Sequence, residues 1–135
     1  SKSDPADGAK ILLRDEPDAI RRKIMRAVTD SGKGVTYDLE KKPAVSNLMA
    51  LYHHATGKTM KDIEKEFAGA GYGDFKKAVA DAVIGMLEPM QKRMTDFRKD
   101  PAELARILDT GRDAATAKAE TMMRTVRERV GLGRG

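Results

Sequence analysis

The sequence of 135 residues contains no cysteine, and only 4% of its residues are aromatic. Without cysteine the chain can form neither disulfides nor thiolate metal sites, so packing alone must hold its core together. The scarcity of aromatic residues predicts a core made mainly of aliphatic and methionine side chains. A chain of this length supports one modest core, and a second independent domain is not expected.

Long apolar runs are also absent. No stretch approaches the roughly 20 apolar residues that a membrane-spanning helix needs, and no charged stretch followed by an apolar stretch resembles a secretory signal. Internal repeats and low-complexity tracts are absent as well. We therefore expect a cytoplasmic protein that does not engage a membrane.

The residues that usually carry catalysis or bind metal are few. The chain has only two histidines, His53 and His54, and neighbours on a helix point about 100° apart, so they cannot hold one metal together. There is no HExxH motif, no cysteine nucleophile and no recognisable set of Ser, His and Asp. We expect no metal site, and we do not expect the chain to be catalytic by itself.

Charge is mildly positive. The chain has 26 Lys and Arg residues against 21 Asp and Glu residues, a net charge of +5. This excess favours encounters with polyanions such as nucleic acids. Many helical proteins carry as much positive charge, so this balance alone does not identify a partner.

Apolar residues recur with helical periodicity along almost the whole chain. We expect an all-α fold, an irregular bundle of about six helices, with no convincing strand. The expected helices cover about residues 17–29, 44–56, 59–69, 75–98, 100–111 and 112–130.

Several of these helix ends have recognisable signals. Thr59 followed by Asp62 resembles a capping box, and Asp100 before a proline is a second helix start. Gly57 and Gly111 are placed where helices should end.

Asp74 is expected to cap the long fourth helix. Pro89 lies inside that helix and predicts a kink, and Met86, Met90 and Met94 are expected in its buried face.

Two groups of basic residues are candidates for RNA binding. Arg22 and Arg26 lie on the face of the first helix opposite its apolar residues, although a solvated helix face would have the same pattern. Residues 30–43 form a basic, flexible loop in which Lys33, Lys41 and Lys42 surround Tyr37. Lysines can approach phosphates and a tyrosine ring can stack on an unpaired base. The alternative is an ordinary surface loop with Tyr37 folded onto the core.

The first residues, Ser1-Lys2-Ser3-Asp4-Pro5, match the end of the KMSKS signature loop of class I aminoacyl-tRNA synthetases. Further segments, in the expected order, resemble the bacterial tryptophanyl-tRNA synthetases of this class. These segments are residues 27–31, 42–43 with 46–48, 69–76, 87–89 and 130–134. The resemblance covers essentially the whole chain.

The resemblance implies a C-terminal fragment that starts inside the signature loop. Residues 1–16 would be the loop remnant and a linker, and residues 17–135 a helical domain that binds the anticodon region of tRNA. The complete enzyme would form tryptophanyl-adenylate from tryptophan and ATP with Mg²⁺, and then esterify tRNA(Trp). It would be a homodimer in which one tRNA spans both subunits. No cofactor is expected to bind the fragment alone.

Within this resemblance, Lys2 is the expected catalytic residue. Pyrophosphate gains negative charge as it leaves ATP, and a lysine placed beforehand stabilises that charge. The hydroxyl groups of Ser1 and Ser3 would bind ATP phosphates or hold the turn. The residues expected to contact tRNA are Arg22, Arg26, Lys33, Lys41 and Lys42.

Two other classes of function fit the same residues. The chain could be a stand-alone helical nucleic-acid-binding module, or a helical protein-interaction domain whose basic faces serve solubility. A steep loss of tRNA affinity with added salt would distinguish RNA binding from protein interaction, because phosphate contacts release counterions.

Overall fold

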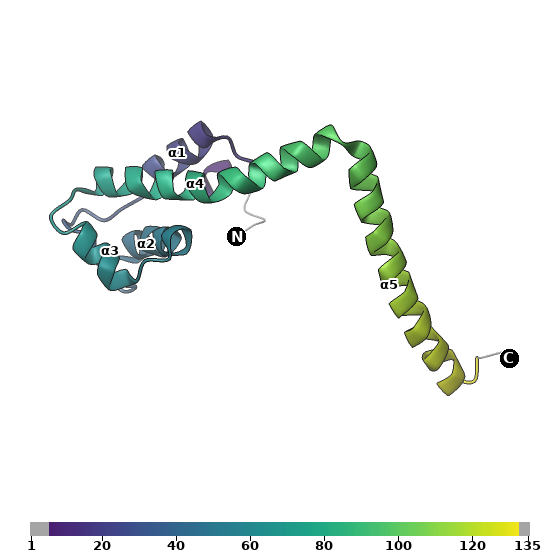
Figure 1. Cartoon of the computed structure of the whole chain (residues 1–135). Coiled ribbons are helices and arrows are strands. Elements are labelled where there is room, and N and C mark those ends of the chain that lie inside the picture. Colours follow the sequence, from purple (N-terminus) through teal and green to yellow (C-terminus); the bar gives the residue numbers. More distant parts are fainter. Residues whose placement is uncertain (1–5, 133–135) are drawn as a thin grey trace. The chain divides into compact units, whose positions relative to one another are not determined.

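A computed structural model of the protein describes residues 6–132. Within this range the chain forms five α-helices and one short 3-10 helix, and it contains no strand (Figure 1). The all-α fold class is thus confirmed, but the expected count of about six helices is not matched. The chain divides into two compact units, Ser1–Lys92 and Arg93–Gly135, and each is described by itself.

The first unit contains the 3-10 helix η1 (Asp7–Ala9), three short helices and the greater part of α4. The short helices are α1 (Pro17–Arg26), α2 (Pro43–Thr56) and α3 (Met60–Glu66), and α4 covers Tyr72–Lys99. In Figure 1, α1 runs beside the first part of α4. Two contacts join these helices: Lys76 Nζ donates to the carbonyl of Ala27 at 2.7 Å, and Arg21 pairs with Asp81 at 2.8 Å.

Local signals explain where α2 and α3 end and begin. Gly57 follows α2 with φ of 75°, a left-handed conformation that suits glycine, and its N–H donates to the carbonyl of His53 at 2.7 Å. The hydroxyl of Thr59 accepts from the N–H of Asp62 at 3.3 Å and donates to the carboxylate of Asp62 at 2.7 Å. Both predicted boundaries are confirmed.

The start of α4 differs from the prediction. The helix begins at Tyr72, and the N–H of Phe75 already donates to the carbonyl of Gly71 at 3.1 Å. Asp74 therefore lies in the first turn rather than at the cap, where its negative charge still favours the positive end of the helix dipole. The helix continues without interruption through Pro89.

The core of the first unit contains a cluster of three aromatic residues. The rings of Tyr52, Phe67 and Phe75 meet edge to face, with centroid distances of 5.4 Å between Tyr52 and Phe67 and 5.0 Å between Phe67 and Phe75. Aliphatic residues from all four helices surround them, and Met49 is fully buried. The core is mainly aliphatic, as expected, but Met49 is its only buried methionine among the described residues, so the expectation of a methionine-rich core is wrong.

The predicted methionine row of α4 is not buried. Met86 and Met90 are 43% and 50% exposed, and Met94 is 36% exposed. The buried face of α4 passes instead through Phe75, Val79, Val83 and Leu87. Leu87 takes the core position, and Met86 lies about 100° around the helix from it.

The second unit consists of the end of α4 and the long helix α5 (Pro101–Arg129). Asp100 caps α5 as predicted, because its carboxylate accepts from the N–H of Glu103 at 3.0 Å. The predicted break at Gly111 is wrong. Gly111 does not have a positive φ, and one glycine inside a helix costs only about 1 kcal/mol relative to alanine. No residue of α5 is buried.

Candidate nucleic-acid interface

Helix α1 presents two arginines on the side away from the core. Ile20 and Ile24 are 0% and 2% exposed and fix the buried face. Arg22 and Arg26 are exposed and lie one helical turn apart, a spacing that places their side chains on the same face. The two guanidinium groups can therefore act on one ligand.

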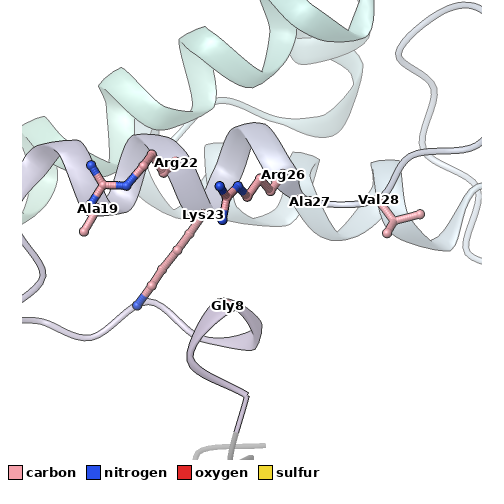
Figure 2. Close-up of a pocket in the computed structure, with 7 residues that line it drawn as sticks. All are labelled: Gly8, Ala19, Arg22, Lys23, Arg26, Ala27 and Val28. Carbon is pink, nitrogen blue, oxygen red and sulfur yellow. The ribbon is translucent and has the colours of Figure 1, made fainter.

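A pocket of about 550 Å³ opens beside these arginines. Figure 2 shows Arg22 and Arg26 on α1 and Gly8 on the segment that precedes the helix. Residues 6–132 provide no ion-pair partner for either arginine, whereas the neighbouring Arg21 is paired with Asp81 and Lys23 with Asp15. The pocket thus offers two uncompensated guanidinium groups, which can bind phosphate through two parallel hydrogen bonds each.

The second basic region, residues 30–42, is held in place by a partly buried contact to α4. The hydroxyl of Tyr72 donates to Asp30 Oδ1 at 2.8 Å, and Lys42 Nζ donates to the Tyr72 hydroxyl at 3.0 Å. Lys42 Nζ also donates to the carbonyls of Lys33 at 3.2 Å and Gly34 at 2.9 Å. We expected a flexible loop, and the structure instead fixes this segment at several points.

The other end of the segment is a tight turn around Asp38. Asp38 Oδ1 accepts from the N–H groups of Glu40 at 3.0 Å and Lys41 at 2.9 Å. The N–H of Tyr37 donates to Glu64 on α3 at 2.8 Å, and the Tyr37 residue remains 39% exposed. Tyr37 is therefore not folded into the core, and its exposed ring is compatible with stacking on a base.

The hydrogen bond from Tyr72 is the largest cause that lowers the pKa of Asp30, followed by the N–H of Gly32 and the charge of Lys42, while desolvation opposes them. We expect Tyr72→Phe to raise the Asp30 pKa toward its ordinary value of about 3.9, since the donor is removed. Carboxyl-carbon NMR titration measures this change. Tyr37→Phe is the control, and an Asp30 pKa that is equal in both variants would contradict the assignment.

The predicted site residues therefore fall into separate groups. Arg22 and Arg26 share the pocket of Figure 2. Lys33 lines a second pocket of about 480 Å³, which residues 32–34 and 69–72 enclose. Lys41 is exposed on the Asp38 turn, and the ammonium group of Lys42 is engaged within the loop. Ser1, Lys2 and Ser3 lie outside the residues that the structure describes.

Sequence reasoning overlooked Tyr72 and Asp30 as the pair that fixes the basic loop. They are 42 residues apart in the chain, so no local pattern could join them. Both lie in segments that carried the family resemblance, and this was the available signal.

Within residues 6–132, no group of three or more His, Asp and Glu residues is arranged to hold a metal ion. No helix in the same range combines the length and the apolar character needed to cross a bilayer.

Comparison with known proteins identifies the family. The model of the class I tRNA synthetases (W and Y) matches residues 1–88. The chain therefore belongs to this family of class I synthetases.

Individual relatives agree with the family assignment. The chain is 45% identical over 134 residues to a tryptophan–tRNA ligase of Oceanobacillus iheyensis, covering 99% of this chain and 41% of the relative. It is 42% identical over 132 residues to a tryptophan–tRNA ligase of Leifsonia xyli, covering 98% of this chain and 39% of the relative. The chain thus spans about two fifths of the length of the curated relatives it matches.

The fold also has a solved counterpart. The crystal structure of tryptophanyl-tRNA synthetase from Mycoplasma pneumoniae superposes with a TM-score of 0.85 at 23% sequence identity. The match covers 98% of this chain and 40% of that chain. At this level of identity the comparison shows the fold alone.

Proposed function

We propose that this chain is the RNA-binding portion of a tryptophan–tRNA ligase, together with part of its signature loop. The complete enzyme would activate tryptophan with ATP, with Mg²⁺ accompanying the nucleotide, and transfer the amino acid to tRNA(Trp). The observation that carries the proposal is the match to tryptophan–tRNA ligases along 98–99% of this chain. The chain alone would not catalyse either step.

Lys2 would act in the first step. The carboxylate of tryptophan attacks the α-phosphate of ATP, and the bond to pyrophosphate breaks as the adenylate forms. The ammonium group of Lys2 would stabilise the charge that develops on the leaving pyrophosphate. The hydroxyls of Ser1 and Ser3 would hold the phosphates or the loop by hydrogen bonds.

The helical part would bind the tRNA in its anticodon region. The two uncompensated arginines of the α1 pocket are suited to backbone phosphates, because a guanidinium group matches phosphate geometry. Lys33 and Lys41 are exposed and can add further phosphate contacts. Lys42 would contribute differently from our first expectation, by fixing the loop that carries Lys33 and Lys41.

The pair Arg22→Ala and Arg26→Ala in the full-length enzyme tests the RNA interface. We expect tRNA affinity to fall about tenfold and the slope of log affinity against log salt to become shallower by about 2, since two phosphate contacts are lost. Tryptophan-dependent ATP–pyrophosphate exchange should be unchanged. Filter binding of tRNA across a salt series measures the first two quantities.

The matched control is Arg21→Ala on the same helix. Arg21 is already paired with Asp81 at the surface, and such pairs contribute little, so tRNA binding should stay near that of the unmodified enzyme. If the control and the double variant lowered tRNA affinity equally, the α1 pocket would not be part of the RNA interface. Homodimer formation remains a prediction from the family resemblance, and a cytoplasmic location remains a prediction from the sequence.

A further inference from the structure

The segment that precedes α1 contains a turn that is closed by one aspartate. The N–H of Asp15 donates to the carbonyl of Leu12 at 3.0 Å, and the N–H of Leu12 donates to Asp15 Oδ2 at 2.9 Å. The backbone and the side chain of Asp15 therefore both hold residues 12–15 in one conformation.

An ion pair joins this turn to α1. Lys23 Nζ lies 2.7 Å from Asp15 Oδ2, and the two side chains are only 11% and 12% exposed. In Figure 2, Lys23 extends from α1 toward the preceding segment of the chain. The hydrogen bond from Lys23 is the main cause that lowers the pKa of Asp15, so the carboxylate is charged at neutral pH.

A glutamine joins the same turn to α4. Gln91 Nε2 donates to the carbonyls of Leu13 and Asp15, both at 2.9 Å. Gln91 belongs to the same unit as the turn, and the two contacts span 78 and 76 residues of sequence. We call Asp15, Lys23 and Gln91 the clasp.

In the sequence, the turn held by the clasp lies between the signature segment and α1, and Lys2 precedes Leu12 by ten residues. Helix α4 does not depend on the two hydrogen bonds of Gln91. The Gln91 side chain makes both of them to backbone carbonyls outside the helix.

We propose that Gln91 is a positioning residue for amino acid activation, which anchors the base of the signature loop to α4 through the carbonyls of Leu13 and Asp15. This inference rests on the proposed function. Gln91 touches no substrate in this proposal. It acts through the loop that carries Lys2.

The proposal predicts a particular kinetic pattern. The charge on departing pyrophosphate exists only in the transition state, so a misplaced loop weakens an interaction that the ground state lacks. Such a loss lowers kcat and kcat/KM equally and leaves the KM values for ATP and tryptophan unchanged. A displacement of about 1 Å at a reacting group can cost up to about 100-fold in rate.

Three substitutions of Gln91 in the full-length enzyme provide the test. We expect Gln91→Ala to lower the kcat of tryptophan-dependent ATP–pyrophosphate exchange about tenfold. Gln91→Glu keeps the shape but removes the donor, and should be at least as slow. Gln91→Lys restores a donor and should recover most of the activity. Glu88→Ala, an exposed change one turn earlier on α4, is the matched control and should leave kcat unchanged.

All variants are compared well below their unfolding midpoints, which are measured in parallel. A lower midpoint with unchanged kcat in Gln91→Ala and Gln91→Glu would mean a purely structural role and would overturn the proposal. Failure of Gln91→Lys to recover activity would also contradict it. An inactive unmodified enzyme would overturn the proposed function itself, which separates the two failures.

Discussion

Replacing Lys2 with alanine in the full-length enzyme is expected to slow tryptophan activation by about 10²- to 10³-fold. This is the range observed when one preorganised group that stabilises developing negative charge is removed from an enzyme. The effect should fall on kcat, because the charge of the leaving pyrophosphate develops in the transition state. ATP–pyrophosphate exchange at saturating tryptophan and ATP measures it.

Lys41→Ala is the matched control for Lys2. Lys41 is also a lysine, and it is exposed on the Asp38 turn of the helical unit. Its removal should raise the KM for tRNA and leave exchange intact, since the proposed role of Lys41 is phosphate contact. Normal exchange in Lys2→Ala would show that the signature loop does not serve activation in this enzyme.

Replacing Phe75 with alanine is expected to destabilise the first unit by about 3–5 kcal/mol. Phe75 is 0% exposed, and its ring meets Tyr52 and Phe67 edge to face. Truncation would remove both aromatic contacts and leave a cavity where α4 meets the other helices. Urea unfolding of the chain, followed by circular dichroism, gives the change in the free energy of unfolding.

Leu39→Ala provides the comparison for Phe75. Leu39 is 64% exposed in the same unit, so its truncation should change the free energy of unfolding by no more than about 0.5 kcal/mol. A similar loss in both variants would mean that the buried aromatic cluster contributes no more to stability than an exposed side chain does.

The helix boundaries that could be predicted are those with local chemical causes. Thr59 caps α3 through its own neighbour Asp62, and Gly57 ends α2 in a conformation that glycine favours. The helix end predicted at Gly111 is wrong, because a glycine ends a helix only where the chain also turns away. Nothing in the local sequence distinguishes that case from a glycine inside a long helix.

Buried faces were harder to predict than boundaries. Met86 and Leu87 are adjacent and both apolar, so periodicity alone could assign either to the core. The choice depends on which side of α4 meets the other helices. Leu87 is 4% exposed and Met86 is 43% exposed, and only the packed structure resolves this difference.

The same distinction between local features and contacts made by packing applies to the candidate site. The exposed arginines of α1 could be predicted, because Ile20 and Ile24 define the opposite face of a single helix. The engagement of Lys42 with Tyr72 and the contacts of Gln91 with residues 13 and 15 could not, since they join residues 30 to 78 positions apart. Such contacts arise only when the helices pack.

Attachment of tryptophan to tRNA by the full-length protein tests the central claim most directly. The family includes synthetases for tryptophan and for tyrosine, so both amino acids should be assayed with ATP and total tRNA. We predict ATP-dependent charging with labelled tryptophan and none above background with tyrosine. Charging with tyrosine instead, or with neither amino acid, would contradict the proposed function.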